Sequence, residues 1–440
     1  MSALAHLYLE RGDSVSGSDA ASSAVTDALA GDGARVFIGH DPANIGDAEL
    51  VVTSTAIRAD NVELREAQAR GLPVVHRAVA AAQLVAKRRV VAVAGTHGKT
   101  TTTTMAAAAL AHLDPLVLSG GRLPGSLYNS RGGKGSFAVI EADESDGSFL
   151  QLTPEVGVVT NVEADHLDQY RDLGEIRAAF ERFAARVSST LVGCVDDHGA
   201  RALLAIAPCD VITYGFDNAD VQADDYRADA GGCTFRLWSA WGDEVVHLPV
   251  GGRHNAQNAM AAVAAGLALR QPLAVMLSAL AAVQLPGRRM ELVGEADGAR
   301  LYDDYGHHPT EIRATLAAAR EMATGRLLCA FQPHRFSRLE AMLDDFAEAF
   351  GSADEVLLVP VYAAGETPIP GADAGHLAAR IRQLDPGRPV TAVESLDVLP
   401  QAVRAVARAG DVVVFMGAGD IYKASRATLA AAAAAEATAN

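Results

Sequence analysis

The apolar residues of this chain fall into short runs that alternate with segments of helical spacing. Val90–Ala94, Phe137–Ile140 and Val156–Thr160 are mostly apolar runs of strand length, and each ends in a polar turn. Between them, apolar positions recur every three or four residues, as expected for helices that pack on a sheet. Such alternation is typical of α/β domains with parallel strands. Since the strand ends of a parallel sheet meet at one edge, polar residues that follow strands are the functional candidates.

The pattern predicts a small α/β unit over residues 1–86. Helices are expected over 1–11 and 61–70, and strands over 34–38, 50–53 and 74–77. Gly12 ends the first helix, and a short strand then ends at Asp19, where an acidic side chain is suited to bind a ribose or sugar hydroxyl. Ser54, His76 and Arg77, at the ends of two other strands, are further candidate substrate residues.

The segment 89–112 has the layout of a phosphate-binding loop. An apolar strand is followed by the loop residues and by an alanine-rich helix predicted over 101–112; the candidate nucleotide-binding residues are Gly95, Thr96, His97, Gly98, Lys99, Thr100 and Thr101. The glycines allow a tight turn, so that amide groups and the helix N-terminus face an anion. Lys99 would place a positive charge on the outer phosphates, and the Thr100 hydroxyl would bind Mg²⁺.

This loop departs from the full Walker A pattern, because Val93 stands where that pattern has its first glycine. A glycine turn with an exposed lysine is the alternative. The flanking strand and helix favour the phosphate loop, and lysine is otherwise rare, with only Lys87, Lys134 and Lys423 elsewhere. A loop lysine is not part of a core, so we expect Lys99→Ala to leave the fold intact.

Two further strand ends carry side chains that bind cations. Glu141 begins a stretch with four acidic residues in six positions, and His166 follows the next strand between Asp165 and Asp168. Oxygen ligands at a strand tip suit Mg²⁺. We therefore predict a metal site with Glu141 as one ligand and His166 as another; a solvated acidic loop and a structural histidine are the alternatives.

Three segments further along the chain complete the candidates. Asn255 and Asn258 lie near the start of a long alanine-rich helix, where their amides could cap the helix or bind a base edge. After a linker at 286–289, a third α/β segment has helices over 310–321, 338–350 and 375–383. Two of its strand ends carry side chains suited to ligand binding: Tyr305, His307, His334, Arg335 and Arg338. The alanine-rich tail after Thr428 predicts a fraying helix.

Composition narrows the class of protein. The chain has 440 residues, which suggests two to three domains, and its net charge of −17 without a basic block argues against nucleic acid as a partner. We expect no membrane segment or signal peptide, because apolar stretches of about 20 residues are missing. The four cysteines are far apart in the sequence, with no C-x-x-C pair, so we expect them to be reduced thiols. Reduced thiols are typical of a cytoplasmic protein.

Six motifs, in order along the whole chain, resemble those of the Mur ligases of peptidoglycan synthesis. They occupy residues 95–101, 141–146, 160–168, 253–259, 303–309 and 332–338. The segments 145–150 and 332–338 look like those of the alanine-adding member of the family. A relative that recycles the tripeptide is the nearest alternative, and folylpolyglutamate synthase is a more distant one.

The resemblance implies an α/β protein of three domains. A Rossmann-like N-terminal domain (1–86) would bind the UDP-sugar, a central P-loop ATPase-type domain (87–287) would bind ATP, and a Rossmann-like C-terminal domain (288–440) would bind the amino acid. It implies a ligase that uses ATP and Mg²⁺ to join L-alanine to the lactyl carboxylate of UDP-N-acetylmuramate through an acyl phosphate. We expect a monomer or a homodimer.

Residue roles follow from the same resemblance. Lys99 would bind the β- and γ-phosphates, Thr100 and Glu141 would hold one Mg²⁺, and His166 would hold a second. Asn255 and Asn258 would lie beside the adenine. The amino-acid site would be lined by His307, a candidate general base, and by His334, Arg335 and Arg338, since arginine is suited to bind a carboxylate.

Two departures from the family pattern matter. Several relatives use a carbamylated central-domain lysine, but no lysine lies between Lys134 and Lys423, so we expect an arginine such as Arg182 to supply the charge. The first strand and glycine loop of the N-terminal domain are also missing from the sequence. We expect either a late start or a copy that lacks part of its sugar-nucleotide site, and a catalytically silent nucleotide-binding protein is the alternative.

Overall fold

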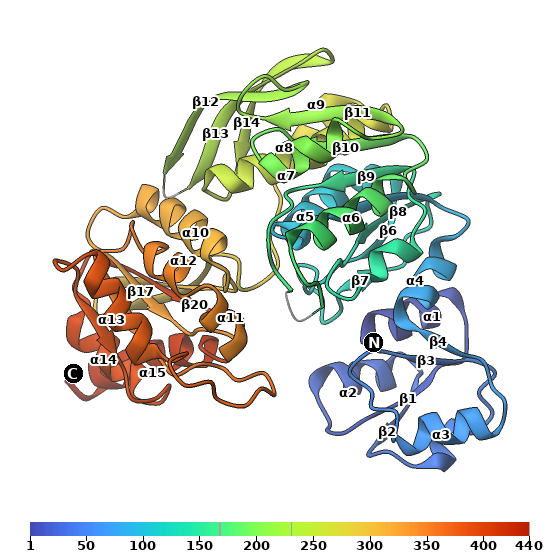
Figure 1. Ribbon diagram of the computed structural model, residues 1–440, viewed down its shortest axis with the longest axis horizontal. Helices are drawn as coiled ribbons and strands as arrows, with labels where there is room; N and C mark the ends of the chain where they lie inside the picture. The colour runs from blue at the N-terminus through green and yellow to red at the C-terminus, as the bar shows by residue number, and fades with distance from the viewer. Residues whose placement is uncertain (167–168, 230, 440) are drawn as a thin grey trace. The chain divides into compact units, whose positions relative to one another are not determined.

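The computed structural model describes residues 1–166, 169–229 and 231–439 (Figure 1). Asp168, which the sequence places beside His166, lies outside the described residues. The chain divides into two compact units: Met1–Asp225 with Phe235–His247 and Gln257–Pro286, and Tyr226–Thr234 with Leu248–Ala256 and Gly287–Asn440. Among the described residues, no helix has the length and apolarity needed to cross a membrane.

The N-terminal part of the first unit contains two small parallel strand pairs. β1 (Ser16–Asp19) pairs with β2 (Arg35–Ile38), and β3 (Val51–Thr53) pairs with β4 (Val74–His76). The helical elements are α1 (Ser2–Arg11), α2 (Ala24–Gly31), a 3-10 turn (Pro42–Ile45), α3 (Val62–Ala69) and α4 (Arg77–Val85). Gly12 ends α1 with a left-handed φ of 95°, a conformation that glycine adopts without strain.

A large sheet forms the centre of the first unit. Its order is β14-β13-β12-β11-β10-β9-β5-β8-β6-β7, and the six strands from β11 to β6 run parallel. The strands are β5 (Arg89–Ala94), β6 (Leu116–Leu118), β7 (Ser130–Arg131), β8 (Phe137–Glu141), β9 (Val156–Val159), β10 (Thr190–Cys194), β11 (Asp210–Gly215), β12 (Val221–Asp229), β13 (Gly232–Ser239) and β14 (Gly242–Leu248).

The strand order fixes where this sheet can bind a ligand. β5 lies between β8 and β9, so the chain turns to one side of β5 first and to the other side afterwards. Parallel sheets open a crevice at such a switch point, at the carboxyl ends of the strands. The surrounding helices are α5 (Lys99–Ala109), α6 (Leu173–Ala184), α7 (His198–Leu204), α8 (Arg253–Ala268) and α9 (Leu273–Leu280) (Figure 1).

The second unit is built around a six-stranded sheet in the order β15-β16-β20-β17-β18-β19. All neighbours are parallel except β15 and β16. The strands are β15 (Glu291–Ala296), β16 (Ala299–Asp304), β17 (Leu327–Phe331), β18 (Glu355–Leu358), β19 (Val390–Ala392) and β20 (Val412–Met416), and the helices are α10 (Pro309–Met322), α11 (Phe336–Ala341), α12 (Leu343–Glu348), α13 (Ala374–Leu384), α14 (Leu399–Val406) and α15 (Tyr422–Ala439) (Figure 1).

Alternation along β17 gives this sheet two apolar faces. Leu327, Cys329 and Phe331 pack with α10, α12 and α13, whereas Leu328 and Ala330 pack with α14 and α15. Successive strand residues point to opposite faces, so a strand that is apolar throughout must be covered on both sides. The α/β fold with a Rossmann-like C-terminal part is therefore confirmed.

Two helix predictions for the second unit were wrong in detail. The helix expected over 338–350 is two short helices separated at Met342, whose φ and ψ are −127° and 27°. The break lets Phe346 enter the core of the sheet. The alanine-rich tail does not fray along its whole length, because Leu429 and Ala432 of α15 pack against the other core of the sheet.

Candidate active site

The loop after β5 turns into α5 through two glycines that no other residue could replace without strain. Gly98 precedes α5 with a left-handed φ of 81°, and Gly95 has φ 134°. A Cβ on Gly95 would lie 1.9 Å from Thr160 Oγ1 and 2.9 Å from Thr160 N. The helix begins at Lys99, two residues earlier than predicted, so its free amide groups open directly onto the loop.

The end of β9 holds the phosphate loop in place. The Asn161 side chain accepts a hydrogen bond from the His97 amide at 2.7 Å and donates one to the His97 carbonyl at 3.1 Å. Thr160 Oγ1 donates to the same carbonyl at 2.6 Å. The Glu163 amide donates to Thr96 Oγ1 at 2.9 Å. Sequence reasoning missed Thr160, Asn161 and Glu163 as supports, although all three lie in the motif at 160–168.

Lys99 is not an exposed loop lysine. Its side chain is 13% exposed, and its ammonium donates to the carbonyls of Gly95 at 2.6 Å and Thr96 at 3.2 Å. It also pairs with Glu144 at 2.8 Å. Burial alone would lower the pKa of Lys99, but the neighbouring carboxylates, Glu144 first, raise it above its usual value. The lysine therefore keeps its charge, and its removal would leave Glu144 without its lysine partner.

Thr100 and Glu141 lie together, as a shared Mg²⁺ site requires. Thr100 Oγ1 donates to Glu141 Oε1 at 3.0 Å, and the Gly120 amide donates to Glu141 Oε2 at 2.5 Å. His166 Nε2 lies 3.5 Å from Glu144 Oε1. Among the described residues, the buried Glu144 Oε2 has no hydrogen-bond partner. A hydroxyl, carboxylates and an unpartnered buried oxygen at one strand edge fit a hard divalent cation.

Two acids of the predicted metal cluster have a different partner. Arg77, at the start of α4, donates to Asp146 at 3.0 Å and to Asp143 at 3.3 Å. His76 Nε2 lies 4.0 Å from Asp146, and its Nδ1 accepts from the Ala78 amide. Arg77 and His76, predicted as substrate residues, thus join the N-terminal elements to the acidic loop beside Lys99.

The two asparagines of α8 have separate surroundings. Asn258 Oδ1 accepts a hydrogen bond from Thr102 Oγ1 at 3.0 Å, and a Cβ on Gly98 would lie 2.8 Å from that oxygen. Asn258 therefore packs under the phosphate loop. Asn255 donates to the Gly251 carbonyl at 2.7 Å, which is a bond to the turn before α8. Both side chains are buried, and their contact with a base stays a prediction.

The N-terminal candidates lie at strand ends as predicted. Asp19 is exposed at the end of β1, and Ser54 is partly buried after β3. Sequence reasoning missed a neighbouring polar cluster, in which Ser18 Oγ donates to Glu63 at 2.5 Å and contacts His40 Nδ1 at 3.0 Å. The signal was weak, because Glu63 belongs to α3 and is 45 residues from Ser18.

In the second unit, the residues predicted to line the amino-acid site lie together at the ends of β16 and β17. His307 lies 5.5 Å from the Tyr305 ring and 5.7 Å from the His334 ring, centroid to centroid. Arg338 Nη1 is 3.4 Å from His334 Nδ1. Arg335 has a φ of 69°, which is uncommon for a residue with a side chain. Cationic and aromatic groups at strand ends suit a small ligand that carries a carboxylate.

We expect His334 to stay uncharged well below neutral pH. Burial, followed by His307, Arg338 and Arg335, lowers its pKa to about 4. The folded pKa lies below the unfolded value of about 6.5, so this histidine destabilises the fold as the pH falls from about 6.5 to about 4. An NMR titration of the His334 ring, assigned with the His334→Gln variant, should give a midpoint near 4. A midpoint at or above 6.5 would contradict this prediction.

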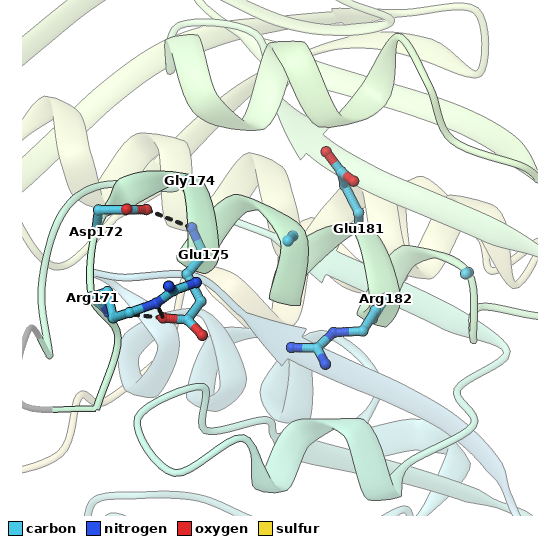
Figure 2. Close-up of a pocket in the computed structure, with 8 residues that line it drawn as sticks. Arg171, Asp172, Gly174, Glu175, Glu181 and Arg182 are labelled. Atoms are coloured by element: carbon cyan, nitrogen blue, oxygen red, sulfur yellow. Dashed lines mark hydrogen bonds and ion pairs between the residues drawn. The ribbon is translucent and has the colours of Figure 1, made fainter.

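Arg182 lies on α6, in a depression lined by charged residues (Figure 2). Arg171 and Glu175 form an ion pair at its other end, and Asp172 caps the helix. Arg182 is exposed and makes no ion pair within the described part of the chain. Burial raises the pKa of Tyr170 and the charge of Arg182 opposes this rise; the Tyr170 hydroxyl donates to the Glu144 carbonyl at 2.6 Å. A role in place of the missing lysine stays a prediction.

This fold and site define the chain as a nucleotide-binding α/β enzyme with a phosphate loop at the switch point of its central sheet. Three sequence profiles match it: the Mur ligase family catalytic domain over 1–89, the Mur ligase middle domain over 93–266, and the Mur ligase glutamate ligase domain over 288–419. The chain belongs to the Mur ligase family.

Individual relatives agree with this assignment. A UDP-N-acetylmuramate–L-alanine ligase from Agrobacterium fabrum is 44% identical, over 96% of this chain and 92% of the relative. One from Cupriavidus pinatubonensis is 45% identical over the same shares. The crystal structure of a UDP-N-acetylmuramate-alanine ligase from Thermotoga maritima matches with a TM-score of 0.82 and 29% identity over 99% and 97% of the two chains. A murein peptide ligase from Psychrobacter arcticus matches with a TM-score of 0.69 and 26% identity over 98% and 96%.

Proposed function

We propose that this protein is an ATP-dependent ligase that joins L-alanine to the lactyl carboxylate of UDP-N-acetylmuramate and releases ADP and phosphate. The observation that carries the proposal is the 43–45% identity, over nearly the whole chain, to curated relatives that bear this activity in their names. The phosphate loop and the cluster of histidines and arginines supply chemistry that fits it. The four cysteines are free thiols, which agrees with a protein located in the cytoplasm.

Each part of the chain has a proposed role in this reaction. Residues 1–86 bind the UDP-sugar, 87–287 bind ATP, and 288–440 bind alanine. Thr100 and Glu141 hold one Mg²⁺, and His166 holds a second. Such an ion supplies positive charge that neutralises the phosphate oxygens during transfer. Asn255 and Asn258 lie beside the adenine.

The first chemical step needs positive charge at the phosphate loop. A carboxylate is a poor electrophile, so the γ-phosphoryl group is transferred to it, giving an acyl phosphate and ADP. Two anions must approach for this step, and the amide groups at the start of α5 and Lys99 offset their repulsion. Lys99 is held by Glu144 and two loop carbonyls, so a phosphate would replace acceptors that are already in place.

The second step uses the residues that we propose bind alanine. The neutral amine of alanine attacks the acyl phosphate, a tetrahedral intermediate forms, and phosphate leaves. His307 is the proposed base for the amine proton; its Nδ1 lies 3.2 Å from the Tyr305 carbonyl oxygen and its amide donates to Glu311. Arg335 and Arg338 bind the carboxylate of alanine.

Arg338→Ala should weaken alanine binding without an effect on ATP. Loss of a hydrogen bond between charged groups predicts a KM for alanine raised on the order of 10- to 100-fold. The KM for ATP should not change. Steady-state phosphate release at varied alanine, and in a separate series at varied ATP, measures the two values, and an unchanged alanine KM would place the carboxylate site elsewhere.

The proposal is tested by phosphate release with ATP, Mg²⁺, UDP-N-acetylmuramate and L-alanine, leaving out one component at a time. Turnover that requires all four supports the ligase. Turnover with L-alanyl-γ-D-glutamyl-meso-diaminopimelate in place of alanine would show the recycling activity instead. ATP binding without any product would show a catalytically silent protein.

A further inference from the structure

A loop that has no role in the proposed reaction pairs with the segment of the second unit that carries Arg335 and Arg338. We call residues 361–369, between β18 and α13, the 361–369 loop. The Tyr362 amide donates to the Pro333 carbonyl at 2.8 Å, and the Arg335 amide donates to the Tyr362 carbonyl at 2.9 Å. Tyr362 and His334 form an isolated parallel bridge. The loop thus adds one rung of strand pairing to the segment that carries the two arginines.

Tyr362 also contacts this segment through its side chain. Its ring stacks on the His334 ring, with centroids 5.4 Å apart and an angle of 12° between the planes. A Cβ on Gly419 would lie 2.7 Å from Tyr362 Cγ, so this glycine packs closely against the base of the Tyr362 ring. His334 therefore contacts Tyr362 through its ring face and Arg338 through its Nδ1 atom.

Glu366 contacts the same segment at the next turn. Its carboxylate accepts hydrogen bonds from the Ser337 hydroxyl at 2.6 Å and from the Ser337 amide at 3.1 Å. These bonds satisfy a free amide group in the first turn of α11, and the negative charge lies near Arg335. The backbone of Arg335 has the uncommon φ of 69°, a conformation that persists only when its surroundings hold it.

We propose that the 361–369 loop is the positioning element of the amino-acid site. Tyr362 fixes His334, and Glu366 fixes the turn between Arg335 and Arg338, so that the two guanidinium groups are in place for the carboxylate of the incoming amino acid. Neither Tyr362 nor Glu366 contacts the substrate; both act through the residues that do. This inference rests on the proposed function, since it assigns the carboxylate to those arginines.

The test compares Glu366→Ala with Glu340→Ala, which removes an exposed carboxylate from α11 itself. We expect Glu366→Ala to raise the KM for L-alanine about 10-fold, with kcat and the KM for ATP changed less than about 3-fold. Glu366→Gln keeps an acceptor for Ser337 and should restore most of the loss. Tyr362→Ala should resemble Glu366→Ala, and Tyr362→Phe, which keeps the stacked ring, should resemble the wild type. Glu340→Ala should leave all constants unchanged.

A second measurement separates the loop from the reaction. Amide hydrogen exchange at residues 335–338 should be faster in Glu366→Ala than in the wild type and unchanged in Glu340→Ala. A wild type that does not turn over L-alanine would refute the proposed function, and exchange would still report on the loop. Unchanged exchange, or an alanine KM that is equal in Glu366→Ala and Glu340→Ala, would overturn the positioning role.

Discussion

Replacing Lys99 by alanine should lower the rate of phosphate release on the order of 10³-fold, which is the scale on which one fixed charge at a transition state acts. The residue stands at the first position of α5, beside the amide groups that we propose bind the phosphates. No other lysine lies within 30 residues of it except Lys87. The exposed Lys134, replaced by alanine, is the matched control and should keep full activity.

The activity of Lys99→Ala must be compared with its stability, because the structure shows that Lys99 also pairs with a buried carboxylate. Lys99 is paired with Glu144, whose side chain is 3% exposed, so Lys99→Ala leaves this buried carboxylate without its lysine partner and with the His166 ring 3.5 Å away. Such a loss typically destabilises a protein by about 3 kcal/mol. The double variant Lys99→Met/Glu144→Gln keeps the volume and removes both charges, so it should regain thermal stability while remaining inactive. If either variant keeps more than about a tenth of the activity, Lys99 is not the phosphate-binding charge.

The parts of this protein that the sequence predicts correctly are those encoded by local patterns. β5 and β8 were predicted from the apolar runs Val90–Ala94 and Phe137–Ile140, and they are found at Arg89–Ala94 and Phe137–Glu141. The candidate residues follow such strands, so a parallel sheet necessarily brings them to one edge. That is why Thr100 and Glu141, 41 residues apart, were expected together and lie within 3.0 Å.

The parts that the sequence does not predict are pairings between distant segments. Local periodicity contains no information that Arg77 meets Asp143 and Asp146, 66 and 69 residues away. The same holds for the bonds from Asn161 to His97. These contacts depend on the order of strands in the sheet, which periodicity leaves open. An acidic cluster therefore suggested one metal site, whereas the structure divides its members between Lys99, Thr100 and Arg77.

Tertiary packing also overrode helix propensity at two places. Residues 338–350 have continuous helical spacing, but the helix breaks at Met342, and Phe346 of the following helix lies in the core of the sheet. Alanine in the tail favours helix without indicating what covers it. In the structure the tail is held by Leu429 and Ala432, two side chains that periodicity alone did not single out.

Gly95→Ala should lower ATP-dependent turnover on the order of 100-fold although it adds a single methyl group. The new Cβ would lie 1.9 Å from Thr160 Oγ1 and 2.9 Å from the Thr160 nitrogen, and φ at this position is 134°. The Thr160 amide is bonded to the Ala94 carbonyl at 3.1 Å, so β9 cannot move aside without losing its pairing with β5. The loop must shift instead, and a displacement of about 1 Å at a reacting group lowers rates on the order of 100-fold.

Two further variants separate the clash from the strain of a positive φ. Gly71→Ala has φ 68° and no atom within 4 Å of the added Cβ, so it should lose a little stability and no activity. The double variant Gly95→Ala/Thr160→Ala removes the nearest atom but leaves the backbone nitrogen at 2.9 Å, so it should recover only part of the activity. Full activity in Gly95→Ala would show that the loop tolerates a shift, and the contact with β9 would then not be what positions the phosphates.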